Sequence, residues 1–151
     1  METVLGALDA TGAEVIVVIP DLEADWGPRY PNLRFYRRPV QLAPLLAECT
    51  LAVTHAGHGT TLDCLLAGVP MVQLPLHIEQ LLVAERLAAT GAGLGLRPTH
   101  VGTGFANVLG EVLPRYREAA ATVAARYRNR PRTRALEEVT GLIGQALEAG
   151  R

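Results

Sequence analysis

The chain has 151 residues, of which 49% are apolar, 19% charged and 5% aromatic, a composition typical of one globular domain with an aliphatic core and not of a disordered or fibrous chain. Its formal net charge of −1 supplies no field that would attract nucleic acid, so we expect no nucleic-acid partner. Two cysteines are too few for a disulfide framework, no stretch has signal-peptide character, and the longest uncharged stretch, residues 64–78, is shorter than a membrane-spanning helix, so we expect a cytoplasmic protein.

Short apolar runs alternate with helical patterns along the chain. The first clear run, EVIVVIP, is rich in β-branched residues and ends at Pro20, and several of the stretches between the runs have apolar residues at helical spacing. In chain order we predict a helix over residues 3–11, a strand over 14–20, a loop over 21–32, a strand over 33–36, a helix over 39–48, a strand over 50–54, a helix over 60–67, a strand over 71–74, a helix over 78–90, a strand over 93–96, and a helical tail over about 104–150 with an interruption near 129–131. Strands that alternate with helices indicate right-handed crossovers, so we predict an α/β domain with a Rossmann-like parallel sheet flanked by helices.

The most informative residues follow the predicted strand TLAVT, at the edge where an open parallel sheet binds ligands. The sequence there reads His-Ala-Gly-His-Gly-Thr-Thr over residues 55–61, and a helix begins. Gly57 and Gly59 let the backbone approach a ligand, and the free N–H groups of the first helical turn point, with the positive end of the helix, at one spot. This turn predicts an anion site that suits a diphosphate. The side chains of the turn that can add hydrogen-bond donors are those of His55, Thr60 and Thr61.

Residues 37–96 resemble the C-terminal donor-binding domain of the GT-B glycosyltransferases that act on small molecules, of the UDP/TDP-sugar type. The matching segment reads THAGHGTTLDCLLAGVPMVQLPLHIEQLLVAERLAATGAGLGL. It contains, in order and at the family's spacing, His-x-Gly-x-x-[Ser/Thr], an acidic residue three positions on, Gly-x-Pro, and Pro-x-x-x-[Asp/Glu]-Gln. The first 36 residues match loosely, by the order of strand and loop. The resemblance implies a single nucleotide-sugar-binding domain over residues 1–151 and a UDP-sugar or TDP-sugar as substrate, with no cofactor. We also expect no metal, because His55 and His58 have no third ligand at a useful spacing.

The resemblance also implies which residues hold the nucleotide. His55, Thr60 and the amides from Gly59 to Thr61 would contact the donor diphosphate. Asp63 would take the ribose hydroxyls, because it lies one turn into the helix whose first turn holds the phosphates.

Two further positions of the pattern concern the sugar and the base. Glu79 and Gln80 occupy the acidic-Gln pair that hydrogen-bonds the hydroxyls of the transferred sugar, and their other interpretation is a helix start with favourable charge. Arg37 stands where the family has its base-stacking aromatic. A guanidinium can stack on a base, and Tyr36 is the alternative residue for that role.

The resemblance implies an inverting hexosyltransferase that acts on a small-molecule or lipid acceptor, yet two parts of such an enzyme have no counterpart in the sequence. One is the acceptor-binding N-terminal domain, which carries the family's histidine base, so none of the four histidines is assigned as catalytic. The other is the apolar strand that opens the family's domain and lies in the sheet between the strands over 14–20 and 50–54. We therefore expect an acceptor-domain subunit or a homo-oligomer as partner, and an isolated chain without activity.

Two other functions stay open from the residues alone. A non-catalytic nucleotide-sugar-binding remnant or sensor would keep the same fold, although the Glu79–Gln80 pair argues against decay. An NAD-dependent oxidoreductase would also begin with Gly57-x-Gly59, but Leu62 replaces the third glycine of that fingerprint.

Half of the 14 basic residues are arginines of the helical tail, between residues 115 and 134. We interpret them first as a solvated helical face. Contact with a partner domain or with the surface of an anionic membrane is the functional alternative.

Overall fold

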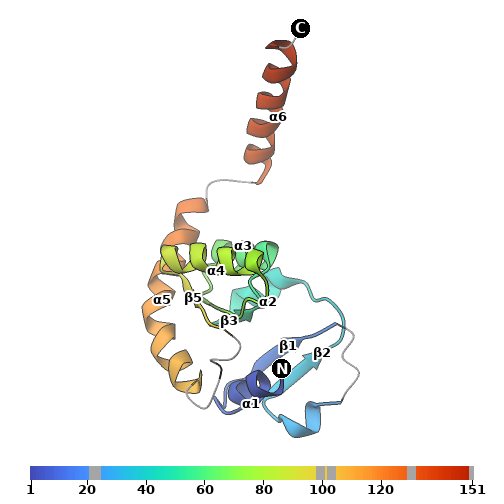
Figure 1. The fold of residues 1–151 in the computed structure, drawn as a ribbon, viewed down its shortest axis with the longest axis vertical. Coiled ribbons are helices and arrows are strands. Elements are labelled where there is room, and N and C mark those ends of the chain that lie inside the picture. The colour runs from blue at the N-terminus through green and yellow to red at the C-terminus, as the bar shows by residue number, and fades with distance from the viewer. Residues whose placement is uncertain (21–24, 98–100, 102–104, 129–131, 150–151) are drawn as a thin grey trace.

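The computed structural model describes residues 1–20, 25–97, 101, 105–128 and 132–149 (Figure 1). Their elements are α1 (Glu2–Asp9), β1 (Val15–Val18), the 3₁₀ helix η1 (Gly27–Arg29), β2 (Leu33–Tyr36), α2 (Leu42–Glu48), β3 (Ala52–Thr54), α3 (His58–Ala67), β4 (Met71–Gln73), α4 (Ile78–Thr90), β5 (Gly93–Gly95), α5 (Phe105–Tyr127) and α6 (Arg132–Ala149). No helix in these ranges has the length and apolar content needed to cross a bilayer.

The predicted alternation of strands and helices is confirmed, with ends that differ by a few residues. The predicted interruption of the tail near 129–131 and the first part of the predicted loop, 21–24, lie outside the described residues. The rest of that loop contains η1, which begins at a Gly-Pro pair. The largest consequence for function is at α3, which begins at His58 and not at residue 60.

The strands form two separate parallel sheets. One has the order β1-β2, with Val15 opposite Leu33, and the other has the order β3-β4-β5, with Thr54 opposite Gln73. Within the described ranges, no ladder joins β1 to β3. The two strands between which the sequence resemblance places an absent strand therefore do not close up on each other, and each has an unpaired edge.

Helix α1 connects the two halves of the core. Its Leu5 packs in the cluster of the β1-β2 sheet with Val17 and Leu33. Its Val4 packs against the cluster of the other sheet, and Leu8 packs against both clusters. The two sheets are thus held together through helix packing in place of backbone hydrogen bonds.

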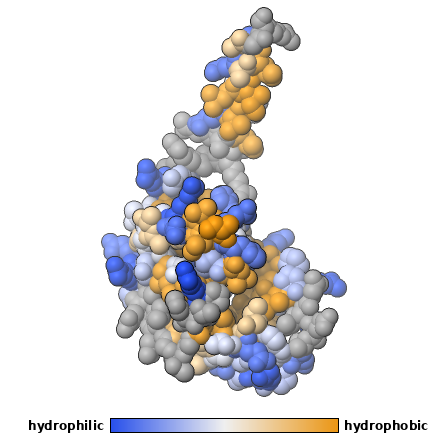
Figure 2. Space-filling model, viewed as in Figure 1, coloured by the Kyte–Doolittle hydropathy of each residue, from blue (hydrophilic) through white to orange (hydrophobic). Residues whose placement is uncertain are grey.

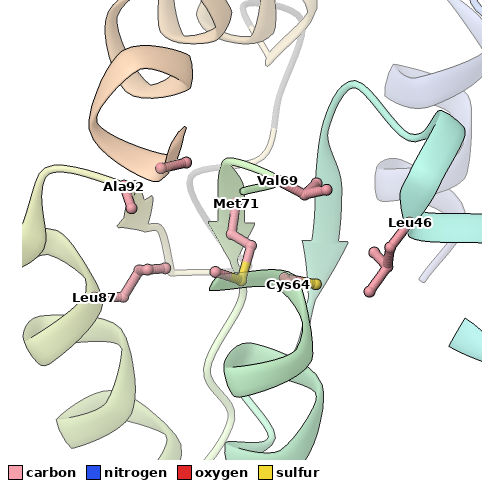
Figure 3. Close-up of a cluster of buried hydrophobic side chains, with 7 residues drawn as sticks. Leu46, Cys64, Val69, Met71, Leu87 and Ala92 are labelled. Carbon is pink, nitrogen blue, oxygen red and sulfur yellow. The ribbon is translucent and has the colours of Figure 1, made fainter. Parts of the chain in front are cut away.

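The three-stranded sheet is covered by α3, α4 and α5. Figure 3 shows Met71 of β4 at the centre of the buried cluster, between Cys64 of α3 and Leu87 of α4. Met71 and Val72 are fully buried, as expected for a central parallel strand that is covered on both faces. This rigid support determines where the loops after β3 and β4 lie.

The last helix, α6, extends away from the rest of the molecule in Figure 1. Its large apolar side chains form a face that Figure 2 shows in orange and that is more than half exposed, with Leu136 at 67%. The residues of this face are Leu136, Val139, Leu142, Ile143 and Leu147. An amphipathic helix of this kind gains most of its stability from packing, yet this face stays exposed among the described residues.

Candidate functional site

The turn between β3 and α3 has a defined and strained geometry. Ala56 has φ of +64°, although it carries a Cβ, and it is buried. A non-glycine residue at positive φ costs about 1 kcal/mol or more, and such residues cluster at functional sites. The backbone N–H of Ala56 donates to the hydroxyl of Thr54, 3.2 Å away, which helps to hold the turn in this shape.

The amino end of α3 presents backbone donors. Gly57 is the N-cap residue and no side chain caps the helix. The first intrahelical hydrogen bond is from the N–H of Thr61 to the carbonyl of Gly57, at 2.9 Å. The N–H groups of His58, Gly59 and Thr60 precede it and have no acceptor among the described residues. With the positive end of the helix dipole, these three donors form a turn that is suited to an anion.

The geometry corrects the expectation for Thr61. Because α3 begins two residues earlier than predicted, the N–H of Thr61 is already used within the helix. Its hydroxyl also donates inward, to the carbonyl of Gly57 at 2.8 Å, and the side chain is buried. Thr61 therefore offers neither of the donors that the sequence predicted for a ligand, and the first donor of the turn is instead the N–H of His58.

His55 lies on the solvent side of the same turn. Its side chain is exposed, and a Cβ added to Gly57 would lie 3.1 Å from the Nε2 atom of His55. The absence of a side chain at position 57 thus leaves the imidazole room to lie against the turn. An imidazole nitrogen is thereby placed next to the backbone donors of α3, where it can add a further hydrogen bond to an anion.

The second loop leaves the carboxyl end of the neighbouring strand. Thr54 of β3 pairs with Gln73 of β4, and the N–H of Leu74 donates to the carbonyl of Thr54 at 2.7 Å. Since the strands are parallel, the loop to α4 emerges at the same edge as the His55 turn. Both sequence-predicted loops therefore belong to one edge of the sheet.

Glu79 and Gln80 lie in the first turn of α4. Glu79 is exposed. The Oε1 atom of Gln80 accepts a hydrogen bond from the backbone N–H of Leu76 at 2.7 Å, so this side chain holds the loop that precedes its own helix. Its Nε2 group has no partner among the described residues and can donate to a ligand hydroxyl.

A cleft of about 740 Å³ lies beside α3 and includes Asp63. The segment that follows β2 forms its other wall, and the complete lining is Val40, Gln41, Leu42, Ala43, Leu46, Asp63, Leu66 and Ala67. The cleft is thus open beside the second turn of the helix whose first turn carries the free N–H groups. Arg37 and Tyr36 are exposed on the chain that leads into this wall, but neither lines the cleft.

Two residues in this region were missed from the sequence. Gln41 lines the cleft, and Gln73 is fully buried behind the His55 turn, where it bonds to Thr61. The available signal for Gln73 is a single polar residue in the otherwise apolar run MVQL.

Cys64 is buried in α3, and the half-buried Cys49 at the end of α2 packs against the same core cluster. Burial raises the pKa of Cys64 to about 12 and also raises the pKa of Cys49. Both thiols are therefore protonated near neutral pH and are poor nucleophiles and metal ligands. No cluster of three or more His, Cys, Asp or Glu side chains suited to a metal occurs in the described part of the chain.

Free backbone amides, a cleft along the same helix and polar side chains at the neighbouring strand end lie at the edge where α/β domains with parallel sheets commonly bind ligands. The fold is that of the C-terminal domain of GT-B glycosyltransferases. It matches the solved glycosyltransferase of kitacinnamycin with a TM-score of 0.79 and 23% identity, over 93% of this chain and 38% of that one. It also matches the glycosyltransferase VinC, solved in complex with dTDP, with a TM-score of 0.69 and 23% identity, over 90% of this chain and 42% of that one.

The chain belongs to the family of erythromycin biosynthesis protein CIII-like C-terminal domains, whose model matches residues 2–142. A curated relative, the L-demethylnoviosyl transferase of Streptomyces niveus, is 38% identical over 93 residues, which are 61% of this chain and 24% of the relative. The resemblance that the sequence motifs indicated is thus confirmed and extends over most of the chain. This family match argues against the NAD-dependent oxidoreductase that the sequence left as an alternative. The chain spans about a quarter of that relative and well under half of the solved glycosyltransferases.

Proposed function

We propose that this domain binds a nucleotide-sugar, a UDP-sugar or TDP-sugar, as the donor half of an inverting hexosyltransferase. The observation that carries the proposal is the convergence at one sheet edge of the α3 amides, His55 and the Glu79–Gln80 pair, with the Asp63 cleft alongside. A diphosphate would accept hydrogen bonds from the N–H groups of His58, Gly59 and Thr60 and from His55. Asp63 would accept from the ribose hydroxyls, and Glu79 with Gln80 would bind the sugar.

The nucleobase of the donor would lie beyond Asp63, toward the segment that contains Arg37. The cleft wall begins at Val40, three residues after Arg37, so the guanidinium is close enough along the chain to fold over a bound base. Tyr36 at the end of β2 is the alternative stacking group.

In an inverting transfer the acceptor hydroxyl loses its proton to a base while its oxygen forms a bond to the anomeric carbon and the bond to the diphosphate breaks. The negative charge that grows on the leaving diphosphate would be stabilised by the α3 amides and His55, which are aimed at it before the reaction. This chain supplies the leaving-group half of that scheme. The proton acceptor would come from a partner that binds the acceptor.

Isothermal titration calorimetry tests the proposed function directly. We expect the folded chain to bind UDP or TDP at least about tenfold more tightly than uridine or thymidine, because charge-assisted hydrogen bonds to the diphosphate add to those of the nucleoside. Titration with GDP, compared with UDP and TDP, shows which nucleobase the site prefers. Failure of the folded protein to bind any of the three diphosphates would remove the proposal.

Association with a partner is part of the same proposal. Among the described residues β1 pairs only with β2, the side chains of Ile16 and Val18 in this strand are 41% and 37% exposed, and the apolar face of α6 is also exposed. Unpaired strand edges and apolar faces favour association. We expect size-exclusion chromatography of the chain alone to show concentration-dependent oligomers. A dilute monomer with a sharp cooperative melting transition would contradict the expected need for a partner or a second copy.

A further inference from the structure

Gln73 is a polar side chain in the apolar core behind the His55 turn. It ends β4, its exposed fraction is 0%, and its Nε2 donates to the hydroxyl of Thr61 at 2.7 Å. Its Oε1 is buried and has no hydrogen-bond partner among the residues that the structure describes. A buried unsatisfied acceptor costs on the order of 1–3 kcal/mol, so an apolar side chain would stabilise this position better. The carboxamide therefore calls for an explanation beyond packing.

The hydrogen bonds of Thr61 give this contact a direction. A hydroxyl has one proton, and that of Thr61 is donated to the carbonyl of Gly57 at 2.8 Å. Toward Gln73 the hydroxyl can only accept, which fits the observed Nε2 donor at 2.7 Å. The result is a relay in one direction, from the Gln73 amide through the Thr61 hydroxyl to the Gly57 carbonyl.

The relay ends on the peptide group that carries the first anion-binding donor. The Gly57 carbonyl accepts from both the N–H and the hydroxyl of Thr61, at 2.9 and 2.8 Å. This carbonyl and the N–H of His58 belong to one planar peptide unit and point in opposite directions. Two hydrogen bonds to one end of the unit therefore fix the direction of the N–H at its other end.

We propose that Gln73 is a positioning residue for the donor diphosphate, which acts through Thr61 and Gly57 to aim the N–H of His58. The preceding residue, Ala56, is held at positive φ, so the turn needs an anchor on its helical side to keep this shape. The inference rests on the proposed function, because it concerns the same diphosphate. It adds a residue that touches no ligand but sets the direction of a group that does.

The test compares diphosphate with nucleoside binding in matched variants. Thr61→Val removes the hydroxyl with little change of volume, Thr61→Ser keeps it, and Gln73→Met removes the amide. Calorimetry with UDP and uridine, or with TDP and thymidine if the wild type prefers them, is read for each. Thr61→Val and Gln73→Met should bind the diphosphate about fivefold or more weakly, while Thr61→Ser stays within about twofold of wild type. Nucleoside affinity should stay unchanged, and circular dichroism confirms the fold.

The outcomes separate this inference from the proposed function. A wild-type chain that binds no diphosphate overturns both. A wild-type chain that binds, with Thr61→Val and Gln73→Met equal to it, overturns the positioning role alone. Equal losses for diphosphate and nucleoside would also overturn it, because they show a general structural role. If Gln73→Met does not fold, the Thr61→Val and Thr61→Ser pair decides.

Discussion

Replacing His55 by alanine is expected to weaken the binding of UDP or TDP by roughly tenfold to a hundredfold. A hydrogen bond to a charged group contributes about 1.5–3 kcal/mol, and the exposed imidazole of His55 lies against the turn that carries the α3 donors. The affinity for the nucleoside should change little, since the imidazole would contact the phosphates. Calorimetry with the diphosphate and the nucleoside measures both effects on one protein.

His77→Ala is the matched control for this substitution. His77 is the N-cap residue of α4, its side chain is exposed, and it makes no capping hydrogen bond, so its loss should leave diphosphate affinity within about twofold of wild type. Both variants should melt within a few degrees of the wild type because neither removes a buried contact. The assignment of His55 to the phosphates would be wrong if the two variants bound UDP and TDP equally well.

The strands were predictable because each is a short, largely apolar run between turn or helical patterns, and the runs EVIVVIP and MVQLP also end at proline. The start of α3 was predicted two residues late for a physical reason. Gly57, His58 and Gly59 have weak helix propensity, so the pattern indicates a turn, yet in the structure the helix already begins at His58. That shift changed the donor set, because it uses the N–H of Thr61 within the helix.

Other features of the site depend on contacts that no sequence pattern contains. The role of Gln73 follows from a bond to Thr61, twelve residues away, and from an acceptor that stays unpaired. The cleft beside Asp63 depends on how α2 packs against α3. The separation of β1 from β3 was not predicted, because the family resemblance only places an absent strand between them, and periodicity within a strand does not say which strand is its neighbour. The ligand roles of Arg37, Glu79 and Gln80 stay predictions.

Replacing Gly93 by alanine is expected to destabilise the domain by about 3 kcal/mol, because no space exists for even one methyl group. Gly93 begins β5 opposite Met71 of β4, and an added Cβ would overlap the carbonyl oxygen of Met71 and lie 2.8 Å from the Cδ2 atom of Leu87. Met71 is fully buried and Leu87 is 2% exposed, so neither can move without disturbing the core. Thermal unfolding should shift down by roughly 10 °C.

Gly141→Ala provides the matched control, since the same atom added on the exposed face of α6 meets nothing within 4 Å. It should stabilise the helix by up to about 1 kcal/mol through helix propensity. A Gly93→Ala variant that melts with the wild type would show that β4 and β5 can separate freely. In that case the close packing of β5 against β4 would not be what holds β4 in place. The contact of Gln73, at the end of β4, with Thr61 would then not depend on that packing, and the sheet would not be what positions the anion-binding turn.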